Sequence, residues 1–131
     1  MSSSSKNLIL ADDDADDVEL FQLALQEACI EHKLIVAADG AVLLEKLSEN
    51  ASLDLIILDL NMPRVDGFHC IRKIRSDSAY DKVPIIILST RAFQPDIQYC
   101  LSNGASKFYK KPFSFSELCV IVKSICDEYI N

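Results

Sequence analysis

Polar side chains that can bind metal and phosphate follow four of the apolar stretches in this 131-residue sequence. The four positions are Asp12-Asp13-Asp14 after 8–11, Asp59 after 55–58, Ser89-Thr90 after 85–88, and Lys110-Lys111-Pro112 after 106–109. Carboxylates packed side by side raise one another's pKa and repel unless a positive charge lies among them. A divalent cation meets that need. Because neither His nor Cys lies beside these carboxylates, the hard ion Mg²⁺ fits best.

Asp59 is the residue that this arrangement predicts to react. An aspartate beside a metal ion can act as a nucleophile toward phosphorus and form an aspartyl phosphate. The cation and Lys111 would offset charge on the transferred group, while the Ser89 hydroxyl and the Thr90 backbone amide would donate hydrogen bonds to its oxygens. The backbone carbonyl of Asn61, two residues after Asp59, would supply a further metal ligand.

The acidic run also has an interpretation without chemistry. Carboxylates favour the positive end of a helix dipole, so a solvated helix start explains such a run equally well. We adopt that interpretation for Asp14, Asp16 and Asp17, with Asp14 or Asp16 as the N-cap. For the pair Asp12-Asp13 we favour metal binding, because an aspartate and a lysine stand at the ends of other predicted strands.

Five apolar runs of strand length alternate with stretches of helical spacing. The runs lie at 8–11, 34–37, 55–58, 85–88 and 106–109, and the central ones are continuous, which is typical of strands buried on both faces. Apolar stripes at 18–28, 43–47 and 68–74 predict the first three helices. Strict alternation implies a parallel (βα)5 sheet with helices on both faces. In such sheets ligands bind beyond the carboxyl ends of the strands, where the polar residues fall.

The last two helices carry recognisable end signals. Pro95 suits the first turn of the fourth helix, and Gly104 suits a left-handed cap after it. The fifth helix is expected to open at Ser114 or Ser116. Ser114 with Glu117 three residues on forms a capping-box pattern.

Composition limits the function classes. The length suits one domain with a full core, so we expect any effect to be delivered by the domain's own surface. A net charge of −7 argues against nucleic-acid binding, and no apolar run approaches a membrane span or a signal peptide. The five cysteines form no C-x-x-C pair and predict reduced, partly buried thiols of a cytoplasmic protein. They are Cys29, Cys70, Cys100, Cys119 and Cys126.

Together these residues resemble the receiver domains of bacterial response regulators. The resemblance is carried by Leu8–Asp14, by Leu58–Pro63 followed by Asp66-Gly67, by Leu88–Thr90 and by Lys110–Phe113. It covers essentially the whole chain after the serine tail, so residues 6–131 are expected to form the receiver domain and residues 1–5 a flexible tail. The implied fold is flavodoxin-like, with the doubly wound strand order 2-1-3-4-5 that chemotaxis receivers share.

The resemblance also implies roles for individual residues. Asp59 would accept a phosphoryl group from a phosphohistidine on a sensor histidine kinase or a histidine phosphotransfer protein. Mg²⁺ would be held by Asp13, Asp59 and the Asn61 carbonyl, and by Asp12 through water. Ser89 and Lys111 would follow the phosphate, and Phe108 would be the aromatic that swings with the hydroxyl. The fourth helix, fifth strand and fifth helix would form the readout face.

Three residues depart from the common receiver pattern. Thr90 stands where a small residue is frequent, and Phe108 replaces the common Tyr. Arg91 lies where side chains of the family tune dephosphorylation, so the phosphate lifetime is open. The downstream partner and any homodimer are open as well.

Two other functions remain as alternatives. One is a receiver fold used as a scaffold without phosphorylation, against which the intact site residues count. The other is an aspartate-nucleophile phosphatase, but such enzymes need a second carboxylate two residues after the nucleophile, where this chain has Asn61. We therefore expect a signalling domain rather than an enzyme with its own substrate.

Overall fold

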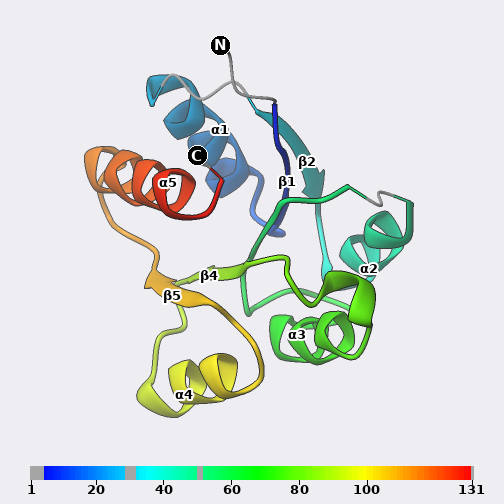
Figure 1. The fold of residues 1–131 in the computed structure, drawn as a ribbon. Helices are drawn as coiled ribbons and strands as arrows, with labels where there is room; N and C mark the ends of the chain where they lie inside the picture. The colour runs from blue at the N-terminus through cyan, green and yellow to red at the C-terminus, as the bar shows by residue number, and fades with distance from the viewer. Residues whose placement is uncertain (1–4, 29–31, 50–51, 131) are drawn as a thin grey trace.

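Five parallel strands form one sheet in the order β2-β1-β3-β4-β5, in a computed structural model that describes residues 5–28, 32–49 and 52–130 (Figure 1). The strands are β1 (Asn7–Ala11), β2 (Lys33–Ala37), β3 (Leu55–Leu58), β4 (Ile85–Ser89) and β5 (Lys107–Lys110). The predicted runs agree with them to within one residue at each end, and the predicted strand order is confirmed. Residues 1–4 of the expected tail and Cys29 lie outside the described residues.

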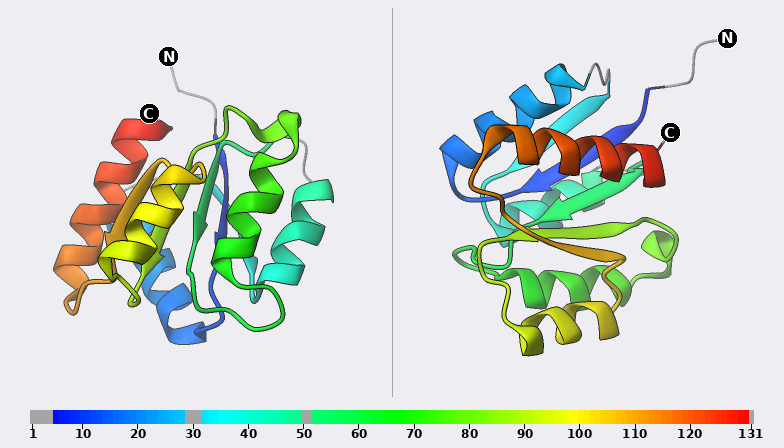
Figure 2. Two further views of the ribbon diagram at one scale, coloured as in Figure 1. Left: turned by 90° about the horizontal axis from the view of Figure 1, so that it is seen from below. Right: turned by 90° about the vertical axis from the view of Figure 1, so that its left-hand side faces the viewer.

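Helices cover both faces of this sheet (Figure 2). They are α1 (Ala15–Glu27), α2 (Gly40–Glu49), α3 (Gly67–Arg75), the short 3₁₀ turn η1 (Ser78–Tyr80), α4 (Gln94–Ser102) and α5 (Phe115–Tyr129). α1 and α5 lie side by side on one face, while buried residues of α2, α3 and α4 pack against the other. Among the described residues, no helix combines the length and the apolar character needed to cross a bilayer.

The two faces of the sheet divide the core between them. In β1, Ile9 and Ala11 pack toward α2 and α3, whereas Leu8 and Leu10 pack toward α1 and α5. Every residue of β3 and β4 is buried, as expected for strands covered on both sides. Because successive side chains of a strand point to opposite faces, each strand contributes to both halves of the core. The polar residues that follow the strands lie beyond this core, at the carboxyl ends of the strands.

The helix starts follow the predicted end signals. The Asp14 carboxylate caps α1 by accepting hydrogen bonds from the backbone N–H groups of Asp16 and Asp17. The Ser114 hydroxyl caps α5 by accepting from the Glu117 N–H at 3.2 Å. Each cap fixes where a loop enters the next helix. These loops follow β1 and β5, and they carry residues of the candidate site.

The end of α4 also matches its prediction, and its start differs by one residue. The helix begins at Gln94 rather than Pro95, with Pro95 still in the first turn. Gly104 has a φ of 115°, and a Cβ there would lie 2.6 Å from the Arg75 Cγ, so conformation and space both require glycine.

The described cysteines are free thiols, as predicted. Cys70, Cys100 and Cys126 are buried, and Cys119 is half-buried. Burial raises the pKa of Cys70 to about 12 and the pKa values of Cys100 and Cys126 to about 11. These three thiols therefore stay protonated and serve as small core residues.

Candidate functional site

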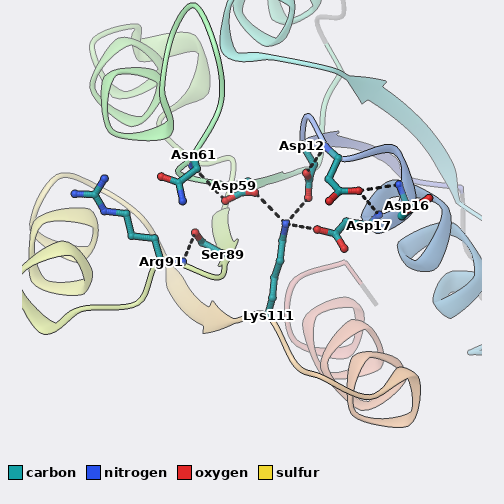
Figure 3. A network of polar contacts seen from close by, with 9 residues as sticks. Asp12, Asp16, Asp17, Asp59, Asn61, Ser89, Arg91 and Lys111 are labelled. Atoms are coloured by element: carbon teal, nitrogen blue, oxygen red, sulfur yellow. Dashed lines mark hydrogen bonds and ion pairs between the residues drawn. The ribbon is translucent and has the colours of Figure 1, made fainter.

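Three polar side chains are buried in the described part of the chain, and all three lie at the carboxyl ends of strands. Asp12 follows β1, Asp59 follows β3, and Ser89 ends β4, with exposed fractions of 4%, 5% and 0%. Burying a carboxylate is costly unless it is paired, so this edge is where the fold accepts an energetic penalty. The structure thus brings together residues that the sequence places 30 to 77 positions apart (Figure 3).

Lys111 supplies the positive charge for these carboxylates. Its side chain extends from the end of β5 into the acidic edge, where Nζ lies 2.8 Å from Asp12 Oδ2 and 2.9 Å from Asp59 Oδ2 (Figure 3). Burial by itself lowers the pKa of Lys111, but hydrogen bonds to the surrounding carboxylates outweigh it and raise the pKa above its usual value. The amine therefore stays charged, as its predicted role requires.

Asp17 is the residue that the sequence interpretation assigned incorrectly. We expected a solvated helix-start carboxylate, but Asp17 Oδ2 lies 2.7 Å from Lys111 Nζ. The first turn of α1 runs across the end of β1, which brings Asp17 over the lysine. No pattern in the sequence separates Asp17 from Asp16, whose side chain is exposed. The contact follows only from the direction in which α1 leaves the sheet.

A candidate metal-binding group lies at the same edge. One carboxylate oxygen from each of Asp12, Asp13 and Asp59 lies within 4.8 Å of the others. These ligands are all oxygen, which is the donor set that Mg²⁺ prefers, so the residues present fit the predicted ion. Burial raises the pKa of Asp12, and its contacts with Lys111 oppose that shift.

The oxygens of Asp12 are already engaged, whereas Asp13 lies in solvent. Asp12 Oδ1 accepts from the Asp14 N–H at 2.9 Å, and Asp12 Oδ2 contacts Lys111. Asp13 is exposed on the outer side of the group. Direct binding of the ion by Asp13, and binding through water by Asp12, stay predictions.

The loop after β3 is held close to Asp59. The Asn61 N–H donates to Asp59 Oδ1 at 3.3 Å, and the Gly67 N–H donates to the Leu60 carbonyl at 3.0 Å. A Cβ at Gly67 would lie 2.6 Å from the Asp59 carbonyl oxygen, so only glycine lets α3 start this near. The backbone of Asn61 is thereby fixed beside the predicted metal ligands.

The loop after β4 connects the buried hydroxyl to two helices. Ser89 Oγ accepts from the Arg91 N–H at 3.1 Å. The Arg91 guanidinium pairs with Asp96 of α4 at 2.9 Å and lies 5.1 Å from the centroid of the Phe68 ring of α3. Thr90 is exposed between them. Arg91, which the sequence marked as a departure from the family, therefore braces the loop that carries Ser89.

Phe108 lies one layer below these residues. It is half-buried in β5, pairs in register with Ile87, and packs against the core cluster on the α3 and α4 side. Its predicted swing requires a second conformation, so that role stays a prediction.

A doubly wound sheet of this order with an acidic edge defines the flavodoxin-like receiver fold. The chain matches the response regulator receiver domain over residues 8–123, and it belongs to that family. Receiver domains of this kind receive phosphoryl groups from histidine kinases or phosphotransfer proteins, and they bind Mg²⁺ at an acidic pocket. The family is a signalling domain and not an ordinary enzyme.

Solved structures resemble the chain over nearly its whole length. The phosphorylated cyanobacterial phytochrome response regulator RcpA has a TM-score of 0.90 and 30% identity, covering 98% of this chain and 96% of that one. The Mn²⁺-bound response regulator Rcp1 has a TM-score of 0.83 and 25% identity, covering 93% and 92%. The chemotaxis regulator CheY4 of Vibrio cholerae has a TM-score of 0.80 and 28% identity, covering 93% and 99%.

Curated relatives are longer than the matched region. Chemotaxis protein CheY1 of Helicobacter pylori is 33% identical over 81 residues, which cover 62% of this chain and 65% of that protein. The transcriptional regulatory protein PrrA of Mycobacterium tuberculosis is 33% identical over 122 residues, which cover 93% and 50%. The chain thus spans about half to two thirds of the length of these relatives.

Proposed function

We propose that this receiver takes a phosphoryl group onto Asp59, with Mg²⁺ bound at the acidic edge, and that the modification switches a protein-interaction surface of the domain. One observation carries the proposal. Asp59 is buried at a strand end, 2.9 Å from a charged lysine and within reach of an ion shared with Asp13. A buried carboxylate that faces both a cation site and an amine is arranged for reaction with an anionic phosphoryl group.

In the proposed transfer, an oxygen of Asp59 attacks phosphorus in a phosphohistidine. The new P–O bond forms as the P–N bond breaks, and the imidazole nitrogen leaves with the electron pair and takes a proton. Lys111 holds its charge beside the oxygens of the transferred group. The Ser89 hydroxyl turns from the Arg91 N–H toward the phosphoryl oxygens, where the Thr90 backbone amide also donates.

We assign the metal ligands as Asp13, Asp59 and the Asn61 carbonyl, with Asp12 acting through water. The oxygen-only donor set and the engaged oxygens of Asp12 support this assignment. A bound Mg²⁺ ion would supply positive charge to the transferred group and screen the carboxylates from one another. The Mn²⁺-bound form of Rcp1 shows that a structurally similar receiver holds a divalent cation.

The switch follows from Ser89. When its hydroxyl turns toward the phosphate, the Arg91 N–H loses its acceptor, and Phe108 on the neighbouring strand is expected to move inward with the hydroxyl. The phosphate favours one of two pre-existing arrangements because it makes these hydrogen bonds in only one of them. We place the readout on α4, β5 and α5, the elements joined to Ser89 and Phe108.

The donor is a sensor histidine kinase or a histidine phosphotransfer protein. RcpA, a phytochrome response regulator, has a higher TM-score than CheY4, which supports testing a phytochrome-type sensor kinase first. We further propose that the domain acts through its own surface in the cytoplasm. The downstream protein is unknown, and a homodimer is an additional prediction.

Mass measurement after incubation with acetyl phosphate and Mg²⁺ tests the proposal. The parent should gain one phosphoryl group as acetate leaves, Asp59→Asn should gain none, and chelation of Mg²⁺ should abolish the gain. Asp81→Asn is the matched control, because it makes the same change at an exposed position before β4. No gain from acetyl phosphate or from a kinase would favour the scaffold function. Steady hydrolysis of unrelated phosphate esters would favour the phosphatase.

A further inference from the structure

Three carboxylates surround the amine of Lys111 in this structure, two as hydrogen-bond acceptors and one as an ion-pair partner. An ammonium carries three N–H groups, and three carboxylates surround Nζ at hydrogen-bond distance. The partners are Asp12 at 2.8 Å, Asp17 at 2.7 Å and Asp59 at 2.9 Å. A phosphoryl oxygen that bonds to this amine therefore competes with carboxylate oxygens that are already in place.

The three acceptors differ in how easily they can leave. The Asp12 and Asp59 side chains are 4% and 6% exposed, so neither can reach solvent without moving its strand end. The Asp17 side chain is 35% exposed and stands on the first turn of α1. Asp17, like Asp12 and Lys111, lines a hollow of about 270 Å³ between α1 and α5, so exposure and not this hollow separates Asp17 from Asp12.

We propose that Asp17 is a positioning residue that accepts a hydrogen bond from Lys111 in the unphosphorylated protein and must release it when a phosphoryl oxygen bonds there. This inference rests on phosphorylation of Asp59. Asp17 thus acts on the phosphorylated state through Lys111, not by touching the phosphate. The contact between Asp17 and Lys111 favours the unphosphorylated arrangement and weakens binding of a phosphoryl group at Asp59.

The negative charge of Asp17 opposes binding of a phosphoryl group, as its hydrogen bond to Lys111 does. The transferred group adds negative charge at an edge that already holds several carboxylates, and Asp17 is the most exposed of the three around Lys111. Loss of Asp17 leaves Lys111 held by Asp12 and Asp59 and frees one donor. We therefore expect removal of Asp17 to strengthen binding of a phosphoryl group, although it removes an ion pair.

The test compares Asp17→Ala with Asp16→Ala. Both remove one carboxylate from the first turn of α1, but Asp16 is exposed and is not among the partners of Lys111. Beryllofluoride, a phosphoryl mimic, is titrated at saturating Mg²⁺ and followed by ¹⁹F NMR. Asp17→Ala should lower the half-saturating concentration by about twofold to fivefold, the range expected for one partly exposed ion pair. Asp16→Ala should leave it unchanged.

A second measurement separates an effect through Lys111 from a general change in the helix. In a Lys111→Ala background, the added Asp17→Ala substitution should change beryllofluoride binding no more than Asp16→Ala does. Equal behaviour of the two alanine variants in the parent background would overturn the inference, as would the same gain without Lys111. Failure of the parent to gain a phosphoryl group from acetyl phosphate or a kinase would instead overturn the proposed function, and this inference with it.

Discussion

A cation with three oxygen acceptors lies at each of two edges of the sheet, one at the carboxyl ends of the strands and one at their amino ends. The acceptors differ in kind between the two edges. At the carboxyl edge Lys111 contacts the carboxylates of Asp12, Asp17 and Asp59. At the opposite edge Arg75 donates to three backbone carbonyls, those of Tyr80, Val83 and Gly104, at 2.7, 2.8 and 3.0 Å. Tyr80 and Val83 precede β4, and Gly104 precedes β5.

The difference suits one edge to the proposed reaction and the other to a structural role. Backbone carbonyls are neutral and fixed by the chain, so the contacts of Arg75 tie α3, η1 and the loop before β5 together permanently. Burial lowers the pKa of Arg75, which still remains charged. Two of the carboxylates around Lys111 belong to the candidate metal-binding group, and in the proposed function these contacts exchange with an incoming phosphoryl group. Equal numbers of acceptors thus give a structural joint at one edge and, in the proposed function, a switchable site at the other.

The largest expected effect is that of Lys111→Ala. Removing the amine leaves buried carboxylates without their partner, so we expect a loss of about 3 kcal/mol in the free energy of unfolding at neutral pH without metal. Burial already raises the pKa of Asp12, and without the opposing amine its folded pKa should rise further above its unfolded value. The loss should therefore shrink as the pH falls, and Mg²⁺ should also reduce it. Urea unfolding at a series of pH values, with and without Mg²⁺, measures how the loss of stability depends on pH and on the ion.

The same variant should separate phosphorylation from switching. We expect Lys111→Ala to accept some phosphoryl group from acetyl phosphate but to show no change in partner affinity, because the missing amine distinguishes the two states. A phosphorylation-dependent gain in affinity equal to that of the parent would contradict this expectation. A loss of stability that is insensitive to pH and Mg²⁺ would contradict the comparison of the two edges.

Arg75→Ala is expected to have the next largest effect. Three carbonyls lose a charged donor, which we expect to lower the free energy of unfolding by about 2 kcal/mol. Because the acceptors are neutral, this loss should not depend on Mg²⁺. Phosphorylation by acetyl phosphate should match that of the parent once the protein is folded. Lys73→Ala, which changes an exposed cation on the same helix, serves as the control.

Mg²⁺ itself should have a moderate effect on the parent. Binding to the folded state alone stabilises by mass action, by about 1.4 kcal/mol at ten times the dissociation constant. Asp13→Asn should abolish most of this gain, because Asp13 is the proposed direct ligand that does not contact Lys111. Thermal unfolding at increasing Mg²⁺ concentration measures the effect. An undiminished gain in Asp13→Asn would remove Asp13 from the ligand set.

The sequence predicted the edge around Lys111 better than the edge around Arg75. Asp12, Asp59, Ser89 and Lys111 follow apolar strands directly, and parallel strands bring their carboxyl ends to one edge, so their meeting follows from the pattern alone. Arg75 gave no such signal. Its acceptors are backbone carbonyls, which every residue carries, and its position on α3 resembled an ordinary exposed helix cation.

Asp17 escaped prediction for a related reason. A carboxylate in a first helical turn satisfies local rules whether or not it reaches a partner, and the reach depends on how α1 crosses the end of β1. The bracing of Ser89 by Arg91 was missed likewise, since the ion pair with Asp96 and the contact with Phe68 join three separate elements. Contacts that depend on the angle between elements leave no local pattern in a sequence.

The smallest effect is expected at a third cation, Arg64, which shows what an ion pair does when it is exposed. Arg64 has a φ of 67° in the loop after β3, and its guanidinium contacts both oxygens of Asp39, at 2.9 and 3.1 Å. This contact lowers the pKa of Asp39 below its usual value. The stability contributed by the pair is therefore present above the unfolded pKa of Asp39 and is lost as the pH falls through its folded pKa.

Arg64→Gln should move the pKa of Asp39 back toward 3.8, its ordinary value, with little change in stability at neutral pH. An NMR titration of the Asp39 carboxyl carbon measures the pKa directly, with the same titration of Asp77, which caps η1, as an internal control. A pKa that does not rise would show that the hydrogen bond from the Val42 N–H holds the carboxylate charged instead. Together with Lys111→Ala, this variant tests whether burial, rather than the number of contacts, makes a cation of this fold important.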